Sequence, residues 1–246
     1  MAAGKSGNSH KRKGDHNMKQ IQVRKVPYGE TFSVFGDKFV ALDYINGKVL
    51  AIRKEIWKNA PFDTSGVNDL RTASITGHLV EYFLDLCKQG ASDDTIPMNM
   101  IDLKATDGSR EYGTFGMRAG LLTLEQYGKY QDIIPLADDW WCLATPWRTP
   151  NPGWLRSPYT RDANYVWSVN SGGDYSNYDA TYTYGIRPAL YFTSDLLVSI
   201  EDEGEEDAAA DETALYREYR AYVKDWLEGN ADTGKSPLSY EDWKAD

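Results

Sequence analysis

The sequence has few of the residues from which catalytic and metal centres are usually built. Its 246 residues include three His and two Cys. Cys87 and Cys142 have the spacing of neither a metal site nor a disulfide framework, and Cys142 lies in an aromatic run where we expect a small buried hydrophobe. A nucleophilic pair of His78 and Cys142 is the enzymatic alternative, although nothing in the sequence orients it. We therefore predict no catalytic residue, no metal and no cofactor, and a protein that is not an enzyme.

Long apolar runs are also absent. No segment reaches the roughly 18 apolar residues of a membrane-spanning helix, and residues 1–25 lack the apolar stretch of a signal peptide. We therefore expect no membrane span. We expect synthesis in the cytoplasm, with association with a virion as one later destination.

Positive charge is scarce outside the N-terminus. The net charge is −10, with +6 on residues 1–25, −10 on residues 201–246 and −6 between them. Nucleic acid requires a basic face on its partner, so the acidic middle argues against a nucleic-acid partner. The basic N-terminus lacks apolar anchors and is expected to be a solvated tail.

Three short alternating segments begin the predicted domain. They cover 31–35, 38–44 and 48–54, and two-residue turns at Gly36-Asp37 and Asn46-Gly47 separate them. Such turns between alternating segments predict an antiparallel meander.

Helical signals follow the meander. Apolar residues recur at helical spacing over 76–88, and Gly90 is placed to end that helix. Thr123 and Gln126 have the spacing of a capping box at the start of another helix. Asn68-Asp69 are expected to cap a further short turn around Leu70.

The remaining organisation follows from composition. We predict a disordered basic tail over 1–26, a ligand-binding domain over 27–199, an acidic linker over 200–212 and a helical tail over 213–246. Leu215, Tyr219, Tyr222, Val223, Trp226 and Leu227 form an apolar stripe in that tail. We expect the stripe to be covered by another part of the chain or by a partner chain.

The segment Ser168–Tyr184 has a composition unlike the rest of the chain. It holds four Tyr, three Ser and two each of Asn, Asp, Gly and Thr, without Lys, Glu, Gln, Met or Trp. This is the composition of an antibody paratope, in which Tyr gives contact area and Ser, Gly and Asn give adaptable hydrogen bonds. The alternative is a turn-rich loop whose tyrosines pack on the domain. The predicted ligand contacts are Asn170, Asp174, Tyr175, Asn177, Tyr178, Asp179, Tyr182 and Tyr184.

A calcium loop is the other interpretation of the acidic residues here. Asp174, Asn177 and Asp179 do not have the spacing of an EF-hand. A calcium loop of another type remains a minor alternative.

Four short motifs resemble a bacterial and phage domain family of unassigned function. They are Trp140-Trp141-Cys142-Leu143-Ala144-Thr145-Pro146, Trp154-Leu155-Arg156-Ser157-Pro158, Tyr165-Val166 and Gly185-Ile186-Arg187-Pro188-Ala189-Leu190. The resemblance covers roughly residues 28–193. It implies an α+β, C-type lectin-like fold, with the N-terminal meander, two or three helices and a loop-rich C-terminal half.

Within that family, the motif residues are expected to form the scaffold. We assign this role to Trp140, Trp141, Trp154, Arg156, Arg187 and Pro188. Arg has five donors in a rigid fork, so Arg156 and Arg187 are expected to brace loop carbonyls rather than to contact ligand.

The chain also resembles the variable proteins of diversity-generating retroelements. These place a Tyr/Asn/Ser/Asp-rich segment before a fixed C-terminal strand, and mutagenesis at adenines keeps Lys, Glu, Gln, Met and Trp out of it. The resemblance implies a receptor- or ligand-binding protein, displayed on a phage tail or a cell surface, whose ligand is a protein or carbohydrate at a cell surface. A structural tail or virion assembly component without a variable site is the alternative.

Overall fold

A computed structural model describes residues 18–150 and 163–201 of the protein. The described residues fall within one unit, Met18–Glu201. The predicted helical tail, Trp154 and Arg156 lie outside the described residues. Within them, no helix is long and apolar enough to cross a membrane.

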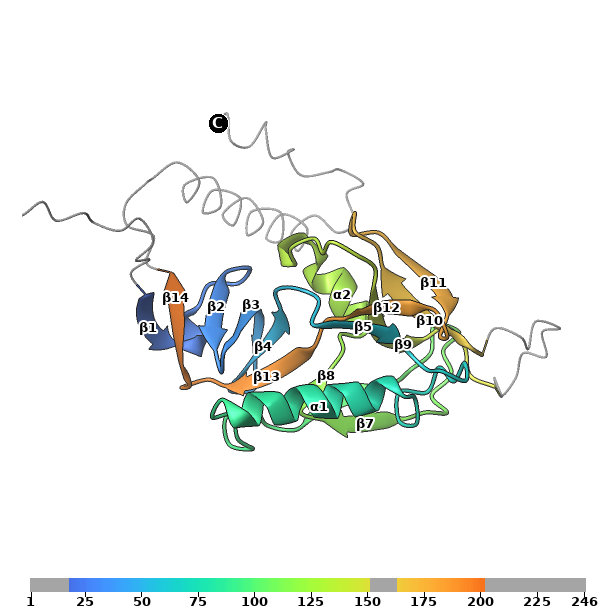
Figure 1. The fold of residues 1–246 in the computed structure, drawn as a ribbon, viewed down its shortest axis with the longest axis horizontal. Coiled ribbons are helices and arrows are strands. Elements are labelled where there is room, and N and C mark those ends of the chain that lie inside the picture. Colours follow the sequence, from blue (N-terminus) through green and yellow to red (C-terminus); the bar gives the residue numbers. More distant parts are fainter. Residues whose placement is uncertain (1–17, 151–162, 202–246) are drawn as a thin grey trace, which may run out of the picture. The chain divides into compact units, whose positions relative to one another are not determined.

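Fourteen strands form three sheets in the described part of the chain (Figure 1). The seven-stranded sheet contains, in spatial order, β1 (Met18–Gln22), β14 (Leu197–Glu201), β2 (Thr31–Val34), β3 (Asp37–Ile45), β4 (Lys48–Arg53), β13 (Ala189–Thr193) and β8 (Ala119–Gly120). The five-stranded sheet contains β11 (Tyr175–Asp179), β10 (Tyr165–Val169), β9 (Trp141–Pro146), β12 (Thr183–Ile186) and β5 (Lys58–Pro61). The third sheet pairs β6 (Asn99–Asp102) with β7 (Thr114–Met117).

The predicted α+β, C-type lectin-like fold is wrong. Strands dominate the described residues, which contain two short α-helices, α1 (Ile75–Lys88) and α2 (Leu124–Tyr130). Two short 3-10 helices, Val23–Lys25 and Gln131–Ile133, accompany them. The difference is largest after residue 140, where Gly, Ser and Asn indicated long loops and the described residues form six strands, β9–β14.

The predicted meander is confirmed, but its first turn lies at Phe35-Gly36, one residue before the predicted Gly36-Asp37. β2, β3 and β4 are antiparallel neighbours. Asn46 and Gly47 both have positive φ, as a two-residue hairpin turn of this kind requires. The meander therefore folds from local turn signals, and the chain adds β13 and β14 beside it much later in the sequence.

The predictions for two helices are confirmed, and so is the capped turn around Leu70. Gly90 follows α1 with a φ of 100°. The Thr123 hydroxyl accepts a hydrogen bond from the Gln126 amide, and the Gln126 side chain accepts one from the Thr123 amide. The chain turns at Leu70, and the Asp69 carboxylate caps this turn by accepting a hydrogen bond from the Arg71 amide. The Asn68 side chain does not cap it and instead donates to the carbonyls of Arg148 and Tyr165.

The segment before α1 is held by one buried carboxylate. The Asp63 side chain accepts hydrogen bonds from the Ser65 hydroxyl and from the amides of Ser65, Val67 and Ser74. Burial raises the pKa of Asp63, but these donors outweigh it and lower the pKa to about 2. The Asp63 amide also donates to the Ala180 carbonyl, which ties this segment to the end of β11.

A strand lies within the segment 1–26 that was predicted to be a tail. Met18–Gln22 pairs with Leu197–Glu201 as β1 against β14. β1 has the sequence Met-Lys-Gln-Ile-Gln and none of its residues is buried, so the sequence alone indicates a solvated tail. The strand depends on pairing with a segment at the other end of the chain, which local sequence does not reveal.

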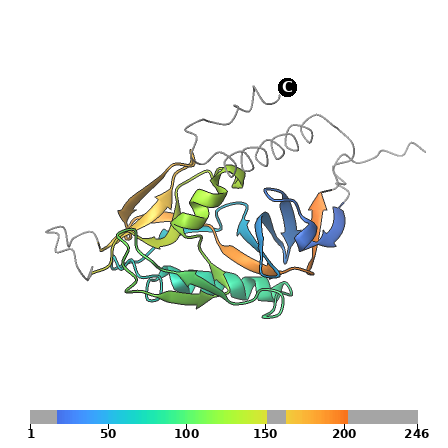
Figure 2. The same ribbon diagram turned by 180° about the vertical axis from the view of Figure 1, so that it is seen from behind.

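Both large sheets are buried on two sides. On the side of α1, Ile75 and Leu79 pack against the five-stranded sheet, and Tyr82 and Leu86 pack against the seven-stranded sheet. Figure 2 shows the same arrangement from behind, with α1 running along both sheets. On the opposite side, Tyr127 of α2 joins a core that draws on both sheets. We call these the α1 side and the α2 side.

Candidate functional site

The Tyr-rich segment forms a β-hairpin at the edge of the five-stranded sheet. β10 and β11 pair in regular antiparallel register, with Val169 opposite Tyr175 and Val166 opposite Tyr178. The chain then turns through Asp179–Tyr182 into β12. Because side chains alternate along a strand, the tyrosines of β11 are divided between the two sides of the sheet.

Tyr175 lies on the α2 side within a row of aromatic rings. Its ring packs edge-on against Trp167, with centroids 5.5 Å apart, and against Tyr127 at 6.1 Å. Trp167 in turn packs against Trp147 at 5.3 Å, and its indole N–H donates to the Thr106 hydroxyl. Tyr175 remains 49% exposed, so the row supports its ring while leaving half of it available for contact.

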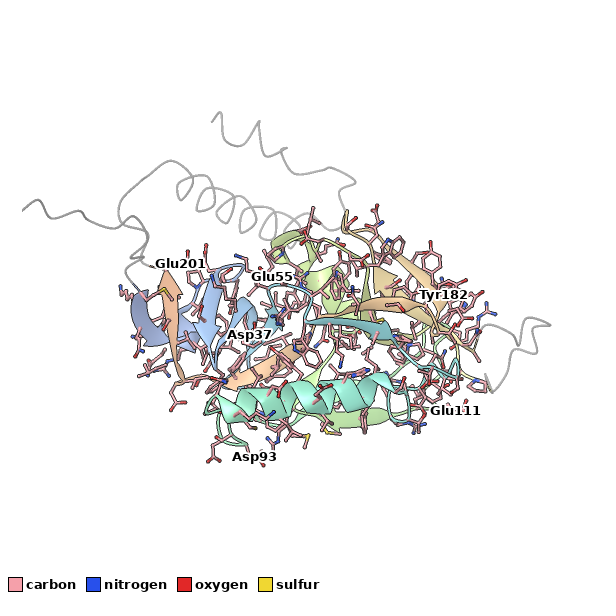
Figure 3. The ribbon with its side chains drawn as sticks, in the orientation of Figure 1. Asp37, Glu55, Asp93, Glu111, Tyr182 and Glu201 are labelled. Atoms are coloured by element: carbon pink, nitrogen blue, oxygen red, sulfur yellow. The ribbon has the colours of Figure 1, made fainter. Side chains whose placement is uncertain are left out.

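Tyr178 lies on the α1 side. It packs edge-on against Trp140 at a centroid distance of 5.2 Å and is 39% exposed. Tyr182 follows on the turn into β12 and is the most exposed of the four, at 58%. Figure 3 shows Tyr182 at the outer part of the five-stranded sheet, away from the seven-stranded sheet.

Tyr184 belongs to the core. It is only 5% exposed and packs in the apolar cluster on the α1 side. Its hydroxyl donates to the Asp179 carbonyl, and burial raises its pKa. Tyr184 cannot contact a ligand in this arrangement, so the exposed tyrosines of the segment are Tyr175, Tyr178 and Tyr182.

The two turns of the segment are braced by its own polar side chains. The Asn170 side-chain oxygen accepts hydrogen bonds from the amides of Gly172 and Asp174. Gly173 has a φ of 89°, a backbone conformation that residues other than glycine rarely adopt. The Tyr127 hydroxyl donates to the Gly173 carbonyl, so α2 anchors the tip of the hairpin.

Asp179 braces the second turn. Its carboxylate accepts hydrogen bonds from the amide and hydroxyl of Thr181 and from the Asn164 side chain. Asn170 and Asp179, both predicted ligand contacts, therefore already have structural partners. Asp174 is exposed, and Asn177 is half-buried beside Trp167 on the α2 side.

The scaffold residues within the described chain are buried or nearly so. Trp141 is 1% exposed and packs edge-on against Tyr127 at 5.5 Å. Trp140 is half-buried, and Pro188 is buried before β13.

Arg187 is completely buried and braces three backbone carbonyls. Its guanidinium donates to Arg53 at 2.8 Å, Lys54 at 2.6 Å and Pro135 at 2.9 Å, and lies 5.2 Å from the centre of the Trp141 ring. Burial lowers its pKa to about 10. This is the bracing arrangement expected of the Arg-Pro motif.

The geometry does not favour a nucleophilic role for Cys142. The thiol is fully buried in the core of the α1 side, and burial raises its pKa. A reactive thiol needs the opposite, a lowered pKa and access to solvent. His78 instead lies within 3.2 Å of the Lys58 ammonium and 3.4 Å of the Glu81 carboxylate on the surface of α1.

Sequence reasoning missed the aromatic row around Tyr175. Trp167 immediately precedes the compositional window, and Trp147 and Tyr127 come from β9's end and from α2. The alternation Tyr165-Val166-Trp167-Ser168-Val169 could have identified the strand and placed Trp167 on the same side as Val169. The contribution of α2 depends on the tertiary fold and leaves no local signal.

Comparison with known protein families gives a match over residues 129–194. The matching family is described as a domain of unknown function (DUF6273). The matched range includes the hairpin, the turn into β12 and the scaffold residues Trp141 and Arg187. No curated protein and no solved structure matches the chain.

Proposed function

We propose that the protein binds a ligand, without catalysing a reaction, through the exposed surface of the β10–β11 hairpin and the turn that follows. The observation that carries this proposal is the exposure of Tyr175, Tyr178 and Tyr182 on a rigidly braced backbone. We call these three residues, together with Asp174 and Asn177, the hairpin surface.

The packing of Tyr175 and Tyr178 against other aromatic rings favours a preorganised binding surface. Tyr175 and Tyr178 each rest edge-on against a tryptophan, so their rings lose little freedom when a ligand binds. The polar turn residues are already hydrogen-bonded to the hairpin itself. A ligand therefore meets fixed aromatic contacts, and half-buried aromatics with a polar tip are frequent in binding hot spots.

The test is a screen of the purified protein against two defined probe sets, a glycan array and a display library of random 12-residue peptides. A Tyr178→Ala/Tyr182→Ala variant is screened in parallel. We expect retained probes to bind the wild type at least about thirty-fold more tightly than the variant, since truncating a hot spot costs about 2 kcal/mol or more. A virion or assembly component without a binding site would give no probe that distinguishes the two proteins.

We also propose that the hairpin surface is diversified by a retroelement. The support is the residue composition of Ser168–Tyr184 together with the placement of Tyr175, Asn177, Tyr178 and Tyr182 outside the core. A genomic repeat of this coding segment that differs only at adenines, close to a reverse transcriptase gene, is the expected observation. A genome sequence without such a repeat would refute diversification and leave the binding proposal standing.

A further inference from the structure

β11 is an edge strand with few of the usual protections. It forms one end of the five-stranded sheet, and no other strand in the described residues pairs with its outer edge. Natural edge strands usually carry Lys or Pro, or are very short. β5, at the opposite end of this sheet, contains both Lys58 and Pro61. β11 has five residues, Tyr-Ser-Asn-Tyr-Asp, and neither Lys nor Pro.

The register shows which backbone groups face outward. The Asn170 amide donates to the Asp174 carbonyl, and the Ala180 amide donates to the Asn164 carbonyl. In an antiparallel pair, hydrogen-bonded and non-hydrogen-bonded pairs alternate. Ser176 and Tyr178 therefore direct their backbone N–H and C=O groups towards β10, whereas Tyr175 and Asn177 direct theirs away from it.

No backbone hydrogen bond among the described residues engages the outward groups of Tyr175 and Asn177. Two residues at i and i+2 thus present a donor and an acceptor each, in the spacing that another extended chain matches. A sugar or a compact ligand has no such repeating pattern of amide groups.

We propose that an extended peptide segment of a partner protein pairs with the outer edge of β11 as an additional strand. This inference rests on the proposed function and specifies how the hairpin surface binds. Main-chain hydrogen bonds to Tyr175 and Asn177 hold the peptide. Tyr175 on the α2 side and Tyr178 on the α1 side then flank it and select its side chains.

Charge near the edge specifies the chemistry of the peptide further. Asp174 immediately precedes β11 and is exposed. Asp138 and Asp139, also exposed, immediately precede Trp140, whose ring contacts Tyr178. Exposed carboxylates thus adjoin Tyr175 in sequence, and also Trp140, whose ring contacts Tyr178. The peptide should therefore carry Lys or Arg next to its paired residues.

In such a complex the main chain of β11 holds the peptide and its side chains select it, which is compatible with a variable surface. Main-chain pairing is indifferent to the side chains of β11, so the edge continues to hold a strand when Tyr175 or Tyr178 is replaced. Substitution of the tyrosines then changes which peptide is preferred without removing the capacity to bind one.

Amide hydrogen exchange of the free full-length protein tests the exposed edge without any ligand. The amides of Tyr175 and Asn177 should exchange at least about tenfold faster than those of Ser176 and Tyr178, which the β10 ladder protects. Equal protection of all four amides would overturn the inference, because the edge would then already be occupied.

Two adjacent proline variants provide the matched test of the fold. Asn177→Pro removes an outward N–H and should leave the melting temperature nearly unchanged, because edge strands accept proline where the N–H faces solvent. Ser176→Pro removes an N–H of the ladder and should lower it markedly. The reverse order would show that the register assigned to the outer edge is wrong.

Binding of Lys- or Arg-containing 12-residue peptides, selected from the random display library, tests the strand itself. Asn177→Pro should weaken binding at least about tenfold more than Asn177→Ala, which also loses the Asn side chain but keeps the backbone N–H. N-methylation of the peptide at alternate residues should abolish binding for one alternate set and spare the other.

The outcomes separate this inference from the proposed function. Peptide binding that survives Asn177→Pro, or glycan binding alone that depends on Tyr178 and Tyr182, would overturn strand pairing and leave the hairpin surface as the binding site. A wild-type dimer that Asn177→Pro converts to a monomer would identify a second copy of the chain as the occupant and would overturn the partner proposed here. Absence of any Tyr-dependent probe would overturn both proposals.

Discussion

Replacing Arg187 by Ala should destabilise the protein more than most single substitutions. The guanidinium is fully buried and donates to three backbone carbonyls, of Arg53, Lys54 and Pro135. Each buried polar group left without a partner costs about 1–3 kcal/mol, and the shortened side chain also leaves a cavity beside Trp141. Removing a buried charge recovers part of its desolvation cost. We expect a net loss of about 3–5 kcal/mol.

The assay is thermal and urea unfolding followed by circular dichroism. For a domain of this size, about 2–4 °C of melting temperature corresponds to 1 kcal/mol, so Arg187→Ala should melt roughly 6–20 °C lower. Arg187→Lys keeps the charge but cannot donate to three carbonyls in fixed directions. Its melting temperature should therefore lie between those of the wild type and Arg187→Ala. A loss below about 1 kcal/mol for Arg187→Ala would refute the bracing role.

Three further substitutions test the scaffold and the hairpin. Trp141→Ala should lower the free energy of unfolding by about 3–5 kcal/mol or prevent folding, measured by urea denaturation; a fully folded variant of unchanged stability would contradict its place in the core. The pKa of Asp63 is lowered from 3.8 to about 2, so its carboxylate should stabilise the fold above about pH 4 and lose that contribution as the pH falls towards 2. Asp63→Asn should therefore have a lower free energy of unfolding at pH 7, and that free energy should decrease less on acidification than in the wild type. Curves of unfolding free energy against pH that run parallel for the two proteins would refute this. Asn170→Ala removes the acceptor that braces the hairpin tip and should accelerate amide exchange at Gly172 and Asp174, whereas unchanged exchange would show that the tip is held by other contacts.

Local signals predicted the parts of the fold that depend on neighbouring residues. The Asn46-Gly47 turn and the capping box of Thr123 and Gln126 each satisfy backbone groups within a few residues, so the sequence alone identifies them. β1 depends instead on β14, at the far end of the unit. Pairing over such a distance leaves no local pattern, so the sequence does not predict the order of the strands in the sheets.

Composition indicated the candidate site but did not show which of its residues are exposed and which are buried or hydrogen-bonded. Four tyrosines in one segment look equivalent in sequence, yet alternation places Tyr175 and Tyr178 on opposite sides, and the turn into β12 directs Tyr184 into the core. Asn170 and Asp179 have the residue types of ligand contacts and instead brace turns. Side-chain partners of this kind become evident only when the strands are paired.

The affinity of the Tyr178→Ala/Tyr182→Ala variant for a probe retained by the wild type tests the central claim most directly. The melting temperature should fall by only about 1–6 °C, because Tyr182 is mostly exposed and the edge-on contact of Tyr178 with Trp140 contributes about 0.5–1.5 kcal/mol. Biolayer interferometry should show at least about thirty-fold weaker binding. A variant that keeps wild-type affinity, or one that loses binding only because it unfolds, would contradict the assignment of the hairpin surface as the binding site.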